Sequence, residues 1–302
     1  MSEGYNQVRD RWSTRTVEWL MYAAAWTLRA LSLPFSIWSL SRLLGGLGSR
    51  LVLLIPAFRR RVEDNLALVR PEMTPAARRS LVRETTHSFI QLTIEYAHLD
   101  RFIRTMEIRT EGIEHLLATQ ASGKGAIVVT AHYGNWEAIR VAAKREGREI
   151  GIIYRAFNNR YLDAFTMNMI PDAGAPVLQK GSGLRQLLQH VRNGGLMMIL
   201  VDQRNSGAPF IDFMGHPAET VTTAAELAAK IGVPLIPARG VRDTANRRFD
   251  VHFETPVAGT DPIAMMTEVN DRISAWITEY PAQWFWFHRR WKSNSRSLGR
   301  EP

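Results

Sequence analysis

The stretch GAIVVTAHYGNWE at residues 125–137 decides the fold. Residues 126–130 are a short run of apolar and β-branched side chains that follows a glycine-containing breaker at 123–125. This pattern is typical of a strand buried on both faces in a parallel sheet. His132 is therefore expected at the carboxyl end of the strand, which is the edge where open α/β sheets bind ligands.

A helical pattern follows from Trp136, with Asn135 as its candidate N-cap and Glu137 in its first turn. A carboxylate five residues after His132 can fix the imidazole tautomer and stabilise the imidazolium formed on proton uptake. Yet a histidine at a strand end is commonly a packed or capping residue, and the helix dipole alone favours a glutamate in a first turn. The spacing by itself therefore favours a structural role for the pair.

Composition limits the classes of function. The 302 residues and their 45% hydrophobic content are ample for one large α/β domain or two small ones. A formal charge of +9 indicates an anionic partner, which is nucleic acid, an anionic lipid surface or an acidic carrier protein. The chain has no cysteine, and its eight histidines form no pair at helical ligand spacing, so we expect neither a metal site nor a cofactor.

From about residue 106, short apolar runs alternate with helical patterns. The alternation predicts an α/β fold with a mostly parallel central sheet flanked by helices. Strands are expected at residues 108–110, 126–130, 150–154, 176–178, 196–201, 234–240 and 249–253. The predicted domains are a polar tail at 1–16, a helical membrane-associated region at 17–104, the α/β domain at 105–292 and a polar tail at 293–302.

Residues 19–40 are strongly apolar but contain Arg29 and Pro34. Arg29 near the centre of a membrane span costs about 2.5–3.5 kcal/mol, and the leucine, isoleucine and phenylalanine side chains return about 2–4 kcal/mol, so spanning stays undecided. Arginines on both sides favour a helix in the membrane interface, with Trp19, Trp26 and Trp38 at headgroup depth. The alternative is a buried core helix.

Five segments, in order, resemble the bacterial lipid A biosynthesis acyltransferases, the late lauroyl and myristoyl transferases. The spelling A-H-x-G-N-W-E at 131–137 resembles their H-x-x-x-x-D/E signature, which the wider glycerolipid acyltransferases share. The other segments lie at residues 154–163, 201–203, 213–220 and 283–292. The resemblance covers roughly residues 15–292 and implies a glycerolipid acyltransferase-like fold.

The resemblance implies acyl transfer from an acyl carrier protein thioester to a hydroxyl of a lipid A precursor in lipopolysaccharide biosynthesis. It implies His132 as general base with Glu137 as the orienting carboxylate, at the cytoplasmic face of a bacterial inner membrane. The chain lacks cysteine and a nucleophile-elbow serine, which favours direct attack over an acyl-enzyme. Backbone N–H groups at residues 133–135 are expected to bind the oxyanion.

Further residues of these segments are expected to bind substrate. Arg155 suits a bidentate grip on phosphate or carboxylate, and its alternative is an ion pair with Asp163 or Asp202. Asp202 could equally orient Arg155, bind the acceptor hydroxyl or cap the next segment. The expected substrate-binding residues are Arg155, Asn158, Asp202, Gln203 and Gly215, with Gly215 in a loop over the site, and Arg289 and Arg290 are expected at lipid headgroups.

Three positions depart from the family pattern: Tyr133 replaces an apolar residue, Ala156 a common proline, and Arg204 an acidic residue. These departures leave the acceptor and the acyl length open. The alternatives are a mannosylated inositol lipid or lysophospholipid as acceptor, or a non-catalytic membrane lipid-binding protein. Nucleic acid is not an expected partner, because the chain carries none of the known nucleic-acid motifs.

Overall fold

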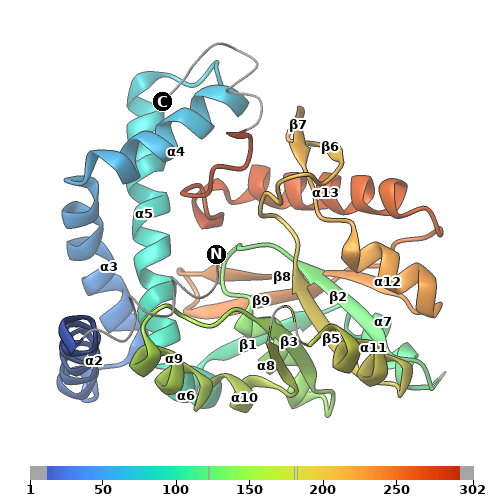
Figure 1. Cartoon of the computed structure of the whole chain (residues 1–302). Helices are drawn as coiled ribbons and strands as arrows, with labels where there is room; N and C mark the ends of the chain where they lie inside the picture. The colour runs from blue at the N-terminus through green and yellow to red at the C-terminus, as the bar shows by residue number, and fades with distance from the viewer. Residues whose placement is uncertain (1–11, 122, 180, 182, 293–302) are drawn as a thin grey trace.

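The computed structural model describes residues 12–292 except 122, 180 and 182 (Figure 1). Residues 1–11 of the predicted N-terminal tail and the predicted C-terminal tail at 293–302 lie outside the described residues. Residues 12–16 were assigned to the tail by the sequence, but they belong to helix α2 (Trp12–Ser32).

A seven-stranded sheet forms the centre of the protein, in the order β1-β9-β8-β2-β5-β3-β4. Its middle strand β2 pairs in parallel with β5 and β8, and β3 pairs in parallel with β5 and β4. Strand β9 is antiparallel to β8 but parallel to β1, so β1 and β9 run against the other five. The predicted mostly parallel α/β fold is confirmed. The strands are β1 (Glu107–Glu111), β2 (Ala126–Thr130), β3 (Ile150–Tyr154), β4 (Val177–Gln179), β5 (Leu196–Leu200), β8 (Leu235–Asp243) and β9 (Arg248–Phe253).

Both faces of the sheet are covered, as the unbroken apolar run of β2 predicts. Ile127 and Val129 contribute to the core beneath helices α11 (Leu184–Arg192), α12 (Thr223–Ile231) and α13 (Pro262–Glu279). Ala126 and Val128 contribute to the opposite core, which includes α6 (Leu99–Thr105), α7 (Ile113–Ala121), α8 (Glu137–Arg145) and α10 (Ile170–Ala173). Alternate side chains of one strand therefore stabilise two separate layers.

A helical column stands beside the sheet, on the left in Figure 1. It consists of α3 (Ile37–Leu53), α4 (Pro56–Val69) and α5 (Pro75–Ala97). Helix α5 passes the carboxyl end of β2, where Glu95 accepts a hydrogen bond of 3.0 Å from the amide of Asn135. The column therefore forms one wall at the edge of the sheet where the sequence places its candidate site.

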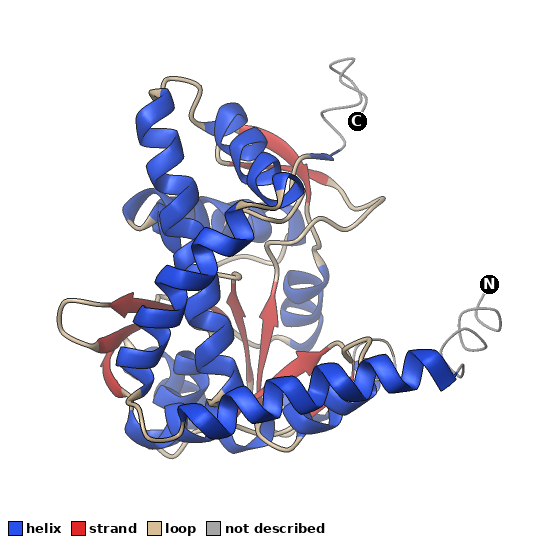
Figure 2. Cartoon of the chain, turned by 90° about the vertical axis from the view of Figure 1, so that its left-hand side faces the viewer, coloured by secondary structure: helices blue, strands red, loops and turns tan. Residues whose placement is uncertain are grey.

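The apolar segment 19–40 is not one helix. Helix α2 ends at Ser32, and α3 begins at Ile37 after the break that contains Pro34. Arg29 is held at the base of the column, donating to the carbonyl of Ala97 at 2.9 Å and to Asp100 at 2.6 Å. Figure 2 shows the helix that leads in from the N-terminus lying across the column.

Among the described helices, none is by itself long and apolar enough to cross a membrane. Helices α3 and α4 pass that test of length and composition only when taken together, and they are bent by 94° at their break. Large apolar side chains are nevertheless exposed along α2, α3 and α4, among them Trp19, Leu20, Trp26, Leu28, Leu31, Leu43, Leu47, Leu51, Leu54 and Phe58.

A small antiparallel hairpin, β6 (Phe210–Phe213) and β7 (His216–Glu219), lies beside α13. The sequence predicted a loop over the site around Gly215. That prediction is wrong, because Gly215 lies in the tight turn of a two-stranded hairpin. Met214 and Gly215 form the turn with positive φ angles of 56° and 80°. Asn270 of α13 anchors the hairpin by donating to the carbonyl of Asp212 at 2.7 Å.

Candidate active site

His132 and Asp202 meet at the carboxyl edge of the sheet. Strands β2 and β5 are parallel neighbours with Thr130 opposite Leu200, so the residues that follow both strands emerge side by side. The ring Nδ1 of His132 lies 2.7 Å from Oδ1 of Asp202, and the backbone N–H of His132 donates to Oδ2 at 2.9 Å. A carboxylate that holds both the ring and the backbone of a histidine fixes the orientation of the imidazole.

Asp202 is buried, with only 2% of its side chain exposed, and it is ionised. Burial by itself raises the pKa of this carboxyl. The charge and hydrogen bonds of His132 and the indole N–H of Trp284, which donates at 2.8 Å, outweigh burial and lower the pKa below its usual value. An ionised Asp202 accepts a hydrogen bond from Nδ1, which leaves Nε2 of His132 as the acceptor nitrogen.

The His132 side chain is 24% exposed, and the Nδ1 edge of its ring faces the buried Asp202. The amide nitrogen of Gln203 lies 3.2 Å from Nε2 and is the donor in this tautomer. The rings of Trp136 and Phe285 flank the imidazole, with centroid distances of 5.4 and 6.1 Å. An acceptor hydroxyl can reach Nε2 by replacing the Gln203 amide.

Glu137 does not orient His132 in this structure. It is fully buried, and its carboxylate accepts hydrogen bonds from Arg140 at 2.5 Å and from the hydroxyl of Tyr96 at 3.3 Å. Arg140 is also fully buried and donates to the carbonyls of Ile150, Ile170 and Gly174. Glu137 points along its own helix because Arg140 follows it by three residues, on the same helix face. The expected orienting role belongs to Asp202.

The expected oxyanion donors are occupied. The N–H of Tyr133 donates to Ala131, that of Gly134 to Gln283 and that of Asn135 to Gly240. Gly134 has a φ of 55°, and a Cβ there would lie 1.9 Å from the carbonyl oxygen of Gly240. The close packing of this turn against Gly240 therefore requires glycine at position 134. The donor that the structure offers beside the imidazole is instead the side-chain amide of Gln203.

The remaining predicted substrate-binding residues lie on the loop after β3 and in the β6–β7 turn. Arg155 and Asn158 are exposed on the loop after β3. Asp163 accepts from the Tyr154 hydroxyl and from the N–H of Phe157, and Asp202 is held by His132, so neither forms the alternative ion pair with Arg155 within the described part of the chain. Gly215 lies in the β6–β7 turn, where its N–H donates to Asp212 at 2.9 Å.

Arg290 is fully buried, which corrects its predicted place at a lipid headgroup. Its guanidinium donates to the carbonyl of Glu219 at 2.5 Å and to the hydroxyl of Thr220 at 2.6 Å. It also lies over the ring of Phe213, 4.9 Å from the centroid. Arg290 therefore ties the C-terminal segment to the hairpin, while Arg289 is exposed.

His288 supports the segment that carries Gln203. Its Nε2 accepts from the backbone N–H of Arg204 at 2.8 Å. Burial lowers the pKa of His288 to about 4, so it is neutral and able to accept. The sequence did not identify this role.

The three predicted interface tryptophans differ in their surroundings. Trp19 and Trp26 on α2 are 51% and 53% exposed. Trp38 is half-buried and stacks on Phe249 at 5.6 Å between centroids, so it is a packing residue in this structure.

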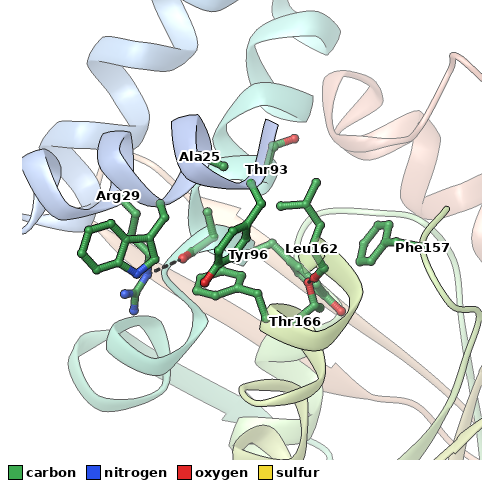
Figure 3. Close-up of a pocket in the computed structure, with 11 residues that line it drawn as sticks. Ala25, Arg29, Thr93, Tyr96, Phe157, Leu162 and Thr166 are labelled. Carbon is green, nitrogen blue, oxygen red and sulfur yellow. Dashed lines mark hydrogen bonds between the residues drawn. The ribbon is translucent and has the colours of Figure 1, made fainter. Parts of the chain in front are cut away.

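An apolar pocket of about 270 Å³ lies between α2, α5 and α9 (Arg160–Met167) (Figure 3). Helix α2 is fixed above α9 by Glu18, which pairs with Arg160 at 3.2 Å and whose carbonyl accepts from Asn159 at 2.9 Å. Tyr96 in the pocket wall lies 6.0 Å from the Trp136 ring, and Trp136 borders His132. One aromatic layer thus separates the pocket from the imidazole. The lining includes Tyr22, Ala25, Trp26, Tyr96, Leu162 and Phe165.

The sequence could not show this pocket, because its walls come from three helices that are distant in the chain. Among the described residues, no group of three or more histidine, aspartate or glutamate side chains is arranged to hold a metal ion.

The family described as bacterial lipid A biosynthesis acyltransferase matches residues 7–293. A phosphatidylinositol mannoside acyltransferase of Mycobacterium tuberculosis is 25% identical over 187 residues, which is 60% of this chain and 58% of that protein. A protein of the same name from Mycolicibacterium smegmatis is 23% identical over 190 residues, which is 59% of this chain and 60% of that protein. The chain thus matches less than two thirds of the length of these relatives.

Proposed function

The chain belongs to the family of bacterial lipid A biosynthesis acyltransferases, and from this we propose that it transfers a fatty acyl chain from a thioester to a hydroxyl of a glycolipid. The observation that carries the proposal is the His132–Asp202 pair at the edge of the sheet, in which the His132 side chain is partly exposed. An apolar pocket one aromatic layer away supports it.

In the first step the acceptor hydroxyl donates its hydrogen bond to Nε2 of His132. As its oxygen attacks the thioester carbonyl carbon, the proton passes to Nε2 and the C–O bond forms. Asp202 stabilises the imidazolium through Nδ1–H, at the 2.7 Å distance already present. The amide of Gln203, displaced from Nε2 by the hydroxyl, donates to the oxyanion that forms on the carbonyl oxygen.

In the second step the oxyanion collapses and the C–S bond breaks. The thiolate leaves with the bonding electron pair and takes the proton from Nε2, so the products are an ester and a free thiol. His132 returns to its neutral form, still hydrogen-bonded to Asp202, and no covalent acyl-enzyme is formed.

We propose a lipid A precursor as the acceptor, as the family description suggests. We propose an acyl carrier protein thioester as the donor. The relatives named phosphatidylinositol mannoside acyltransferase favour a mannosylated inositol lipid as the second candidate acceptor. All these molecules are anionic, and the net charge of +9 is complementary to them. Arg155, Asn158 and Gly215 stay candidates for acceptor contacts.

The pocket between α2, α5 and α9 takes part of the acyl chain in this proposal. Its wall is nearly all apolar, and its volume of about 270 Å³ sets a limit to the length that fits. The exposed apolar side chains of α2, α3 and α4 support a position on the membrane surface, where both lipid acceptor and product would reside. We propose the cytoplasmic face of the inner membrane, where Arg289 is free to meet headgroups.

The experiment is a matrix of donors and acceptors in detergent. The purified protein receives acyl carrier protein thioesters of several lengths with a tetra-acylated lipid A precursor, a phosphatidylinositol mannoside or a lysophospholipid. Ester formation and thiol release are measured together. Stoichiometric ester and thiol with one acceptor support the proposal and identify the substrate. Lipid binding without thiol release, in wild type and His132→Ala alike, would establish the non-catalytic lipid-binding protein instead.

A further inference from the structure

A second concave site lies at the helical column and shares no lining residue with the apolar pocket. It is a cleft of about 630 Å³ between α3, α5 and the turn that joins β8 to β9, and a second hollow beside it shares Arg42, Arg50 and Thr244. Five arginines line the two hollows. Arg242 from β8 is one of them, and the other four are Arg42 and Arg50 from α3, Arg83 from α5 and Arg247 from the turn. We call this site the arginine cleft.

The arginine cleft carries excess positive charge. Within the described part of the chain, Arg242 pairs with Glu95, and none of the other four arginines of the cleft forms an ion pair with a carboxylate. The buried Glu95 nearby is neutralised by Arg242, which binds it with two hydrogen bonds of 2.8 and 2.7 Å. Glu84 at the rim accepts from Ser80. Four exposed arginines therefore line the two adjoining hollows without an ion-paired carboxylate, which suits a phosphate group.

Two local features agree with an anion site. Burial and the charges of Arg242 and Arg42 lower the pKa of His87 in the cleft wall, so the local field is positive. Arg247 has a φ of 55°, a conformation that glycine or asparagine adopts at lower cost. The turn is held by Asp243, which accepts from the backbone N–H of Asn246 at 3.1 Å. A strained backbone at an arginine that lines a hollow points to a function for that side chain.

Helix α3 joins the cleft to an exposed apolar face. Arg42, Gly46, Ser49, Arg50 and Leu53 line the hollow at helical spacing. One residue further along, the exposed side chains Leu43, Leu47, Leu51 and Leu54 form a stripe, with 49–76% of each accessible. A ligand that occupies the cleft with a phosphate and the stripe with hydrocarbon is a phospholipid, whereas inorganic phosphate or an acidic protein leaves the stripe uncovered.

We propose that the arginine cleft binds the phosphate of an anionic membrane lipid and orients the protein on the bilayer. This inference rests on the proposed membrane docking. The cleft lies apart from the acyl pocket, and the lipid it takes is an anchor rather than the substrate. Its arginines act together with the leucine stripe of α3, so charge and hydrocarbon are recognised by adjacent faces of one helix.

The experiment measures binding to vesicles by flotation at fixed ionic strength. Vesicles of phosphatidylcholine with one third phosphatidylglycerol are compared with pure phosphatidylcholine. The double variant Arg42→Gln with Arg50→Gln should bind the anionic vesicles about thirty-fold more weakly than wild type, because each surface arginine contributes about five-fold. Its binding to pure phosphatidylcholine should equal that of wild type.

Two matched variants separate a specific site from diffuse attraction. Arg42→Lys with Arg50→Lys keeps the charge but removes the bidentate geometry, so it should bind anionic vesicles about five-fold more weakly. Arg185→Gln with Arg192→Gln removes the same charge from the exposed surface of α11 and should bind like wild type. Circular dichroism on heating checks that all variants fold equally.

The proposal is overturned if the lysine variant binds like wild type, or if the α11 variant loses as much affinity as the glutamine variant of the cleft. It is also overturned if the glutamine variant binds vesicles normally but loses affinity for acyl carrier protein, which would make the cleft a protein-binding site. A wild-type protein that binds neither kind of vesicle would contradict membrane docking itself. If wild type binds anionic vesicles and the variants of Arg42 and Arg50 bind them equally well, this inference is contradicted and membrane docking is not.

Discussion

Replacing Asp202 by asparagine changes one carboxylate oxygen to an NH2 group, and the structure dictates which one. Oδ2 accepts two hydrogen bonds, from the backbone of His132 at 2.9 Å and from Trp284 at 2.8 Å. The amide oxygen must occupy this position, because an NH2 group there would face two donors. The NH2 group therefore faces Nδ1 of His132 and donates to it.

This arrangement imposes the wrong tautomer on His132. If Nδ1 accepts from Asn at position 202, the ring proton moves to Nε2, which can no longer take a proton from the acceptor hydroxyl. The corresponding change in Ser-His-Asp enzymes lowers kcat about 10,000-fold. We therefore expect a loss of about 1,000- to 10,000-fold, which is about 4–5.5 kcal/mol in the activation free energy.

The assay is single-turnover acyl transfer with the donor bound to saturation, so that kcat is compared and not KM. Glu137→Gln is the matched control, since it makes the same carboxylate-to-amide change five residues from His132. It should keep kcat within about tenfold of wild type, because Glu137 contacts Arg140 and Tyr96 and not the imidazole. A kcat for Asp202→Asn near that of wild type, or a larger loss in folded Glu137→Gln, would refute the reasoning.

Three further predictions concern stability and specificity. Glu137→Ala leaves Arg140 buried without its counter-charge, so denaturant unfolding should show a loss of about 3–5 kcal/mol, with a smaller loss for Glu137→Gln. Burial, followed by the charges of Arg29 and Arg101, lowers the pKa of His98 to about 4. Between these two pKa values the unfolded chain binds a proton at His98 that the folded protein does not bind. The free energy of unfolding should therefore fall as the pH drops from about 6.5 to 4, and it should fall less steeply in His98→Gln. Equal slopes in the two proteins would contradict this prediction. Ala25→Phe should fill the acyl pocket and shift donor preference to shorter chains, while Ala24→Phe, which does not line the pocket, should leave the preference unchanged.

The sheet could be predicted because its signals are local. The run at 126–130 is apolar at every position, and its strand has the predicted bounds with all five residues buried. The hairpin at 210–219 was missed because the residues of its first strand, Phe-Ile-Asp-Phe at 210–213, do not alternate between apolar and polar. Their exposure alternates only in the structure, where β6 pairs with β7.

The sequence did not predict which side chains of the candidate site contact each other. His132 and Asp202 were both expected at the carboxyl edge of the sheet, but their contact depends on β2 and β5 being neighbours, and strand order cannot be read from spacing. Glu137 looked closer in sequence, yet Arg140 on the same helix face holds it in the core. A glutamate followed by arginine at the third position was the local signal for this pair.

The C-terminal segment shows another limit of sequence reasoning. Arg289 is exposed and Arg290 is buried, although both stand in the same basic, aromatic run. After the short helix η1 (Pro281–Gln283) this run has no helical or strand period, so no pattern distinguishes the two arginines. Arg290 differs from Arg289 in its contacts with the β6–β7 hairpin and the residue after it, which the sequence does not show.

The most direct test of the central claim is the rate of acyl transfer from acyl carrier protein thioester to the identified glycolipid by His132→Ala, measured beside wild type. If Nε2 of His132 is the general base, the variant should lose at least about 100-fold in kcat, while its affinity for the glycolipid stays unchanged. A variant that transfers the acyl chain at the wild-type rate would contradict the account.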